Sequence, residues 1–166
     1  QSAVRVRSRA ATITVDGKKR PALNSSGQPI HWSVEGVRNF WRWFGESKVV
    51  DAEGRPLVVY HGTFSDFARF SARKLGENTD DNASSKGYAR TARVGFWFNS
   101  KPMGMSPDKY GAGYTVDMPV YLSIENPHRE MNLDWLAQGL ESETARAYRT
   151  RLIEEGYDGL IVPDEE

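Results

Sequence analysis

The chain has 166 residues, of which 39% are hydrophobic and 27% charged, and its 22 basic and 22 acidic side chains cancel. This length predicts one globular domain with its own core, and the neutral sum gives no general attraction to nucleic acid or anionic membranes. The lack of cysteine excludes disulfides and zinc–thiolate sites, and no apolar run approaches the ~18 residues that span a bilayer.

The first segment is rich in basic residues. Residues 1–20 carry six basic side chains and one acidic side chain, that of Asp16. We expect residues 1–21 to form a basic arm or linker, with a short β-branched strand over residues 11–15. Residues 5–20 could contact nucleic acid or an acidic partner, and a solvated tail is the simpler interpretation.

A helix is predicted over residues 34–44, with Ser33 as its N-cap and Gly45 at its end. The residues that share its apolar face are Val37, Phe40, Trp41 and Phe44. Aromatic residues at this spacing could stack on a ligand, but a helix face that packs into the core is the more common outcome. We therefore predict that this face is core.

The apolar run over residues 57–61 predicts a buried strand that ends in His61, and Gly62 is expected to break it. An imidazole at a strand end can form a hydrogen bond with a hydroxyl group, and a glycine beside it lets another molecule approach the backbone. A structural histidine remains the alternative when this pattern is taken alone.

The segment that follows is polar and aperiodic. Residues 71–93 are predicted to form a long loop, which in a compact domain is usually a functional lid or disordered. A second strand is expected over residues 94–99. Ser106 and Pro107 then open a short helix, as N-cap and first helical residue.

The last third of the chain mixes strands and helices. We predict strands over residues 118–124 and 159–162, and helices over residues 132–138 and 142–155, the latter capped by Ser142. Short strands without regular βαβ alternation indicate an α+β fold. Neither GxGxxG nor GxxxxGK[ST], the common nucleotide-binding motifs, is present.

The three histidines form no HExxH motif or other metal-ligand spacing, so we expect no metal site. The sequence contains no Gly-x-Ser-x-Gly motif and no cysteine nucleophile. Hydrolases of the common nucleophilic kinds are therefore poorly supported.

Six segments occur together in an order that is typical of one family. They are Asn39–Gly45, Ser47–Asp51, Gly54–Thr63, Gly95–Phe98, Pro119–Pro127 and Gly156–Val162. With these segments, residues 22–166 resemble the ADP-ribosyltransferase domain of phage polyvalent proteins and related bacterial toxins, of the His-Tyr-Glu type. The motif from His61 to Thr63 is also similar to that of poly-ADP-ribose polymerases and diphtheria-like toxins. The resemblance implies a split β-sheet core with short flanking helices and long loops.

The resemblance assigns roles to the motif at the end of the predicted strand. It implies that His61 binds a ribose hydroxyl of NAD⁺ and that the backbone N–H and C=O of Gly62 hold the nicotinamide carboxamide. A backbone donor and acceptor match the donor and acceptor of an amide. Thr63 would support the turn or bind a ribose.

Aromatic residues of the family line the nicotinamide pocket. Trp97 stands where the polymerases usually have tyrosine, so it either lines the pocket or belongs to the core. A second aromatic residue stacks on nicotinamide in the family. Tyr110 and Tyr114 both lie in range, and the spacing to Pro119 favours Tyr110.

Cleavage of the bond between nicotinamide and ribose builds positive charge on the sugar, which a carboxylate stabilises. The family supplies a glutamate after the segment that corresponds to residues 156–162. The catalytic residue is therefore Glu165 or Glu166, or a residue beyond the end of this chain, and the usual spacing favours the last. Because the chain begins at Gln1, a longer parent protein is also expected.

The resemblance implies a mono-ADP-ribosyltransferase that uses NAD⁺ as co-substrate and modifies a protein, or alternatively a nucleic acid. Phage or toxin delivery, with action in a host or target cytoplasm, is expected, and no membrane partner. Hydrolysis of NAD⁺ with water as acceptor is the closest related chemistry. The alternative from another class is a catalytically inactive binding or structural module of a larger phage protein.

Overall fold

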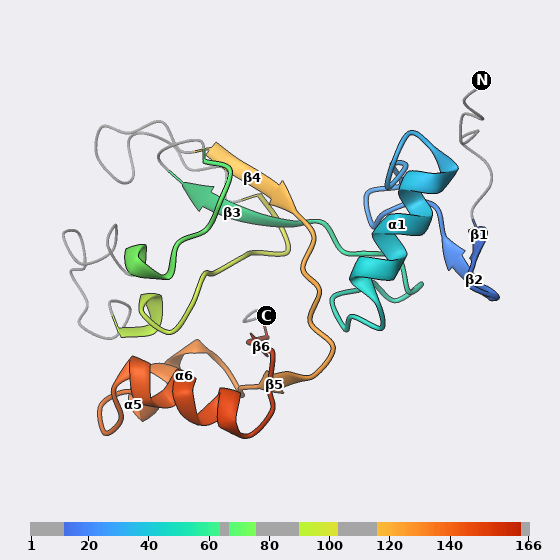
Figure 1. Cartoon of the computed structure of the whole chain (residues 1–166). Coiled ribbons are helices and arrows are strands. Elements are labelled where there is room, and N and C mark those ends of the chain that lie inside the picture. Colours follow the sequence, from blue (N-terminus) through green and yellow to red (C-terminus); the bar gives the residue numbers. More distant parts are fainter. Residues whose placement is uncertain (1–11, 64–66, 76–89, 103–115, 164–166) are drawn as a thin grey trace. The chain divides into compact units, whose positions relative to one another are not determined.

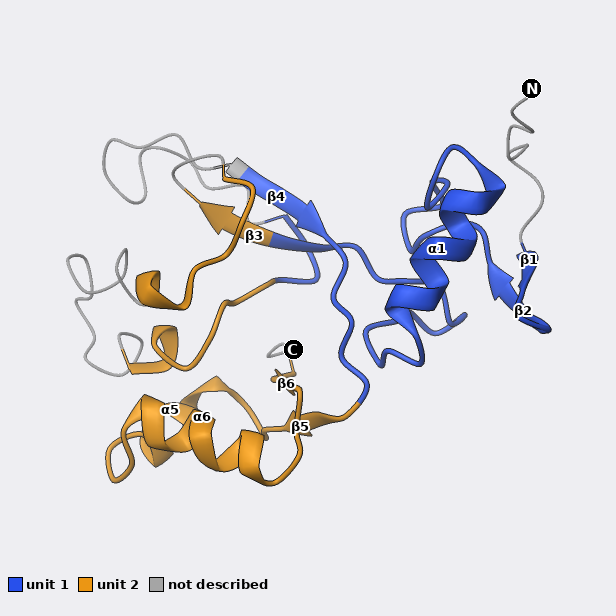
Figure 2. Cartoon of the chain, in the orientation of Figure 1, with its two compact units in different colours: residues 1–60, 99–104, 117–125 blue, residues 61–98, 105–116, 126–166 orange. Residues whose placement is uncertain are grey.

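A computed structural model of the chain describes residues 12–63, 67–75, 90–102 and 116–163 (Figure 1). The chain divides into two compact units (Figure 2). Unit 1 comprises residues 1–60, 99–104 and 117–125, and unit 2 comprises residues 61–98, 105–116 and 126–166. Each unit has a hydrophobic core cluster of its own.

Unit 1 begins with a β-hairpin. Strands β1 (Thr12–Val15) and β2 (Lys18–Pro21) are antiparallel, with Val15 opposite Lys18. The two residues between them, Asp16 and Gly17, have φ values of 47° and 83°, which suit the tight turn of a hairpin. Strand β1 confirms the short strand expected over residues 11–15, and the hairpin joins the core cluster of unit 1 through Val15. Residues 1–11 of the arm lie outside the described residues.

Helix α1 (Val34–Phe44) confirms the predicted helix. The Ser33 hydroxyl accepts a hydrogen bond of 3.1 Å from the backbone N–H of Gly36, as an N-cap does. Gly45 ends the helix with φ 59°, and a Cβ atom there would lie 2.1 Å from the Glu125 carboxylate. The predicted core face is also confirmed, because Val37, Trp41 and Phe44 are buried and Phe40 is half-buried.

Residues 121–125 complete unit 1 by binding the loop that follows α1. The backbone N–H of Lys48 donates to the Ile124 carbonyl at 2.7 Å, and the Ser47 hydroxyl donates to the Leu122 carbonyl at 2.9 Å. Strand β4 (Val116–Val120) therefore ends earlier than the predicted strand over residues 118–124. Its continuation bonds to a loop instead of extending a sheet.

Strands β3 (Val59–Thr63) and β4 form a second two-stranded sheet. The predicted strand end at His61 was wrong, because β3 continues through Gly62 to Thr63. The predicted strand over residues 94–99 was also wrong for most of its length. Only Asn99 pairs, in an isolated antiparallel bridge with Tyr60.

Unit 2 contains two short helices, α5 (Leu133–Gly139) and α6 (Ala145–Glu154). Asn132 caps α5 by accepting a hydrogen bond of 2.8 Å from the N–H of Trp135. Thr144 caps α6 by accepting from the N–H of Ala147 at 3.1 Å. The predicted cap Ser142 was wrong, because its hydroxyl instead donates to the carbonyl of Gly139 at 3.0 Å.

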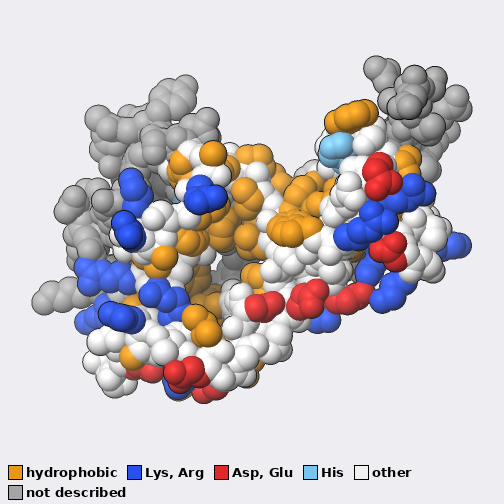
Figure 3. All heavy atoms as spheres, viewed as in Figure 1, with side chains coloured by type: hydrophobic (Ala, Val, Ile, Leu, Met, Phe, Trp, Pro, Cys, Tyr) orange, Lys and Arg blue, Asp and Glu red, His pale blue; other side chains and the backbone are white. Residues whose placement is uncertain are grey.

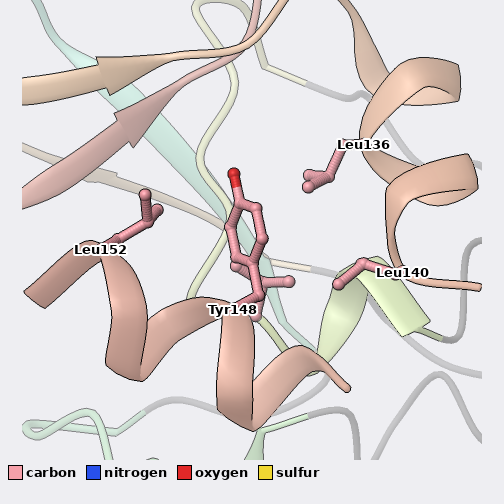
Figure 4. Packing of buried hydrophobic residues seen from close by; sticks show 5 residues of the cluster. Leu136, Leu140, Tyr148 and Leu152 are labelled. Carbon is pink, nitrogen blue, oxygen red and sulfur yellow. The ribbon is translucent and has the colours of Figure 1, made fainter. Parts of the chain in front are cut away.

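The core of unit 2 lies between these helices (Figure 4). The Tyr148 ring lies between Leu152 of its own helix and the pair Leu136 and Leu140. Its hydroxyl donates a hydrogen bond of 2.6 Å to Glu130. Burial, and then the charge of Glu130, raise the pKa of this hydroxyl well above its usual value.

Strands β5 (Pro127–Arg129) and β6 (Gly159–Ile161) are parallel, with His128 opposite Leu160. Strand β5 was not predicted, because the residues that lead into it read as a turn. The mixture of short helices and small separate sheets confirms the expected α+β class. In the described part of the chain, no helix has both the length and the apolar character to cross a membrane.

Candidate active site

Strand β3 carries His61 on the same face as two buried residues. Side chains alternate along a strand, so Val59, His61 and Thr63 point to one side. Val59 and Thr63 are 5% and 4% exposed, whereas His61 is half-buried. The strand is therefore anchored on both sides of the imidazole, and the imidazole keeps an accessible part.

A backbone carbonyl fixes the orientation of the His61 ring. The Nδ1 atom lies 2.8 Å from the carbonyl oxygen of Trp97. A carbonyl oxygen can only accept a hydrogen bond, so Nδ1 must carry the proton and donate. In the neutral ring the lone pair is then on Nε2, which can accept a hydrogen bond from a hydroxyl group.

Phenylalanine rings surround the same imidazole, and we call them the phenylalanine cage. The rings that contact His61 are Phe67 at 6.0 Å, Phe70 at 5.0 Å and Phe98 at 5.4 Å between centroids. Phe70 also meets Phe96 at 4.8 Å. The cage thus combines a polar ring with apolar walls, which is typical of ligand-binding sites.

The sequence predictions missed the cage. Phe67 and Phe70 are three residues apart and follow the His-Gly-Thr motif within ten positions. This spacing, directly after a strand that ends in a candidate binding motif, was the signal available. The sequence predicts no element for residues 67–70 and places residues 71–75 in the long loop. In the structure this segment includes the short 3-10 helix η1 (Ala72–Lys74).

Trp97 acts on His61 through its backbone. The indole is half-buried and packs against the core cluster of unit 2. Its Nε1–H donates to the carbonyl of Thr91 at 2.9 Å, which anchors the ring. The contacts of the Trp97 indole in the structure are therefore those of a core residue. A contact of the indole with nicotinamide stays a prediction.

The structure describes only some of the other predicted site residues. Gly62, which follows His61 on β3, is half-buried, and Thr63 at the end of the same strand is buried. Tyr110, Tyr114, Glu165 and Glu166 lie outside the described residues, so their roles stay predictions. Among the residues that the structure describes, no group of three or more His, Asp or Glu side chains is arranged to hold a metal ion.

A known family matches most of the chain. The model of the family described as ADP-ribosyltransferase in polyvalent proteins matches residues 51–166. The matched region includes β3 with His61, the phenylalanine cage and both helices of unit 2, and it excludes the hairpin and α1. No curated protein and no solved structure matches the chain.

Proposed function

The chain belongs to the family of ADP-ribosyltransferases in polyvalent proteins, and we propose that it transfers ADP-ribose from NAD⁺ to a protein acceptor. The observation that carries this proposal is the orientation of His61. Its Nδ1 is held by the Trp97 carbonyl, and its ring is enclosed by phenylalanines within the matched region. A fixed imidazole with an accepting nitrogen on a strand suits a ribose hydroxyl.

In the proposed complex, Nε2 of His61 accepts a hydrogen bond from a ribose hydroxyl of NAD⁺. The backbone of Gly62 binds the nicotinamide carboxamide, since glycine lets the ring approach the strand closely. The cage then forms an apolar wall beside the bound sugar. Together these contacts hold the bond between nicotinamide and ribose in one place, which lowers the entropic cost of the reaction.

The reaction breaks the C1′–N bond, and nicotinamide leaves with the electron pair. A nucleophile of the acceptor forms the new bond at C1′ and gives up its proton. The sugar passes through an oxocarbenium-like state, which a carboxylate stabilises. We propose a glutamate for this role, with Glu165 and Glu166 as the candidates in this chain and a residue that follows them as the third.

The test replaces His61 by alanine and incubates wild type and variant with labelled NAD⁺ in a bacterial lysate. We expect transfer to fall about 100-fold or more, because the ribose loses its positioning contact. The control is His128→Ala, which replaces the other half-buried histidine of unit 2, a residue bound to Glu130 rather than to the cage. A His61→Ala protein with native circular dichroism and wild-type turnover would contradict the site.

The same incubation separates the remaining alternatives. A labelled product that protease removes identifies a protein acceptor, and one that nuclease removes identifies a nucleic acid. Release of nicotinamide without a labelled product identifies hydrolysis. NAD⁺ binding by the wild type without nicotinamide release identifies an inactive binding module. Phage or toxin delivery and action in a host cytoplasm belong to the same proposal.

A further inference from the structure

Unit 2 contains a hollow whose lining includes none of the residues proposed above to bind NAD⁺. Its volume is about 300 Å³. The lining residues are Ala72, Leu75, Arg93, Thr144, Ala145, Arg146 and Arg149. Three of these seven side chains are arginines and none is acidic, so the hollow has a strongly positive lining. Lys and Arg side chains also gather on part of the surface in Figure 3.

The arginines differ in how they are held. Arg149 donates from Nη1 to the carbonyls of Arg93 and Val94, at 3.2 Å and 3.4 Å. These bonds orient its guanidinium and leave the N–H groups of Nε and Nη2 for a ligand. Arg146 makes no hydrogen bond or ion pair with any residue of the described ranges and is exposed. The hollow thus has one oriented arginine and one that can move to meet an anion.

The nearby carboxylates of the helix pair are engaged elsewhere. Glu143 pairs with Arg151 at 3.0 Å, and Glu141 pairs with Arg90 at 3.5 Å. Glu143 lies so close to Arg151 that the pKa of its carboxyl is lowered. The positive charge that lines the hollow is therefore not neutralised by these two acids.

The hollow also adjoins the first turn of α6. Thr144, the N-cap, and Ala145, the first helical residue, both line it. Backbone N–H groups and the helix dipole at such an end favour an anion, and guanidinium groups bind phosphate oxygens in pairs. The helix end adds to the arginines here and is not the basis of the site.

We propose that this hollow binds phosphate groups. Residues 67–75 carry three basic side chains and no acidic one, and they line the hollow through Ala72 and Leu75. Arg69, Arg73 and Lys74 are exposed, so positive charge continues beyond the hollow. Several basic side chains on one segment beside the hollow favour a polynucleotide backbone as the source, and the pyrophosphate of a free dinucleotide is the second source of the same chemistry.

One segment links this site to the histidine. Residues 67–75 contact the His61 ring through Phe67 and Phe70, and they line the hollow through Leu75. A ligand in the hollow therefore touches the same short segment that holds the imidazole. The proposal goes beyond the transfer reaction, and binding of DNA or pyrophosphate is measured without turnover, so its failure is distinguishable from a failure of the proposed transfer.

The test measures binding to three probes: a fluorescein-labelled 12-nucleotide single-stranded DNA, inorganic pyrophosphate and NAD⁺. Arg146→Glu is the test variant, because this exposed side chain supports no other described residue. We expect it to weaken binding about 10-fold, since charge-assisted hydrogen bonds to phosphate are lost. For DNA, Arg146→Ala should lower the slope of log affinity against log salt by about one.

The matched control is Arg129→Glu, an equal change of charge on the exposed end of β5 in the same unit. The proposal predicts that this variant keeps near wild-type affinity. A response confined to DNA assigns the hollow to a polynucleotide, and a response confined to pyrophosphate and NAD⁺ assigns it to a nucleotide. Equal affinities of the two glutamate variants, or no binding of any probe by wild type, would overturn the proposal. Loss of transfer in His61→Ala leaves these outcomes unchanged.

Discussion

Both units contain a cluster of aromatic rings, but the two clusters enclose different groups. In unit 1, Phe40 stacks on Phe44 at 5.0 Å, and Trp41 meets Phe44 edge-on at 5.3 Å. In unit 2, the phenylalanine cage encloses the imidazole of His61, with Phe70 at 5.0 Å. The ring separations are alike, so distance between rings does not distinguish a core from a site.

The difference lies in the polar atom and its partners. The only polar atom of the Trp41 ring, Nε1, donates to the carbonyl of Pro21 at 2.8 Å and is thereby satisfied within the fold. His61 uses Nδ1 for the Trp97 carbonyl and has a second ring nitrogen for another molecule. An aromatic cluster thus becomes a candidate site when it encloses a group with bonding capacity beyond what the fold uses.

The largest expected effect tests whether the aromatic cluster of unit 1 is a packed core. Phe44 has no exposed surface, so Phe44→Ala leaves a cavity and should lower the free energy of unfolding by about 3–5 kcal/mol. Trp43→Ala on the same helix is the control, because Trp43 is 56% exposed and should cost about 1 kcal/mol or less. Urea denaturation followed by circular dichroism measures both. Similar losses would show that α1 does not pack as described.

A smaller effect tests whether the phenylalanine cage of unit 2 contributes to transfer. Phe70→Leu keeps an apolar side chain but removes the ring that meets His61 edge-on. Such a ring pair contributes about 0.5–1.5 kcal/mol, so we expect transfer to fall roughly 2- to 10-fold. The measurement is the initial rate with labelled NAD⁺.

The matched control for that change is Phe40→Leu, since Phe40 is a half-buried phenylalanine in the cluster of unit 1. Both substitutions should cost less than about 1.5 kcal/mol of unfolding free energy. Only Phe70→Leu should slow transfer at a temperature where both variants are folded. An equal fall in rate for both would remove the distinction between the two clusters.

The smallest effect concerns charge at the hairpin of unit 1. Glu46 bonds to Arg20 and Lys18, and these cations lower the pKa of its carboxyl to about 2 from the usual 4.5. Because the folded pKa is the lower one, the stabilisation is present above about pH 4.5 and is lost as the pH falls through about 2.

Glu46→Gln should therefore lower the urea midpoint slightly at pH 6, and the difference from wild type should shrink towards pH 2. The effect is small because the glutamate is solvent-exposed and screened. Urea midpoints measured from pH 6 to pH 2 check it, with Glu154→Gln as the control, because this exposed glutamate pairs with no residue of the described ranges. A constant difference across this range would contradict the ion pairs as its cause.

Local signals predicted the helices well and the strands less well. Ser33 and the aromatic spacing after it predicted α1, because the cap bond and the buried face involve residues within one or two turns. The start of α6 was wrong, since Ser142 and Thr144 are both capable caps and the sequence does not show which one binds the helix. The prediction of a strand over residues 94–99 was wrong, because the aromatic side chains of this segment pack against Phe70 and the core instead of pointing alternately to the two faces of a sheet.

The amino-acid sequence by itself determined the family, the α+β class, the capped helix α1 and the placement of His61 on a strand. Only the tertiary structure decided which groups surround that histidine. The Nδ1 bond joins residues 36 positions apart, and the hollow joins η1 to the start of α6. Hydrogen bonds and spacing within a few residues are encoded locally, whereas contacts between distant segments depend on how the whole chain packs.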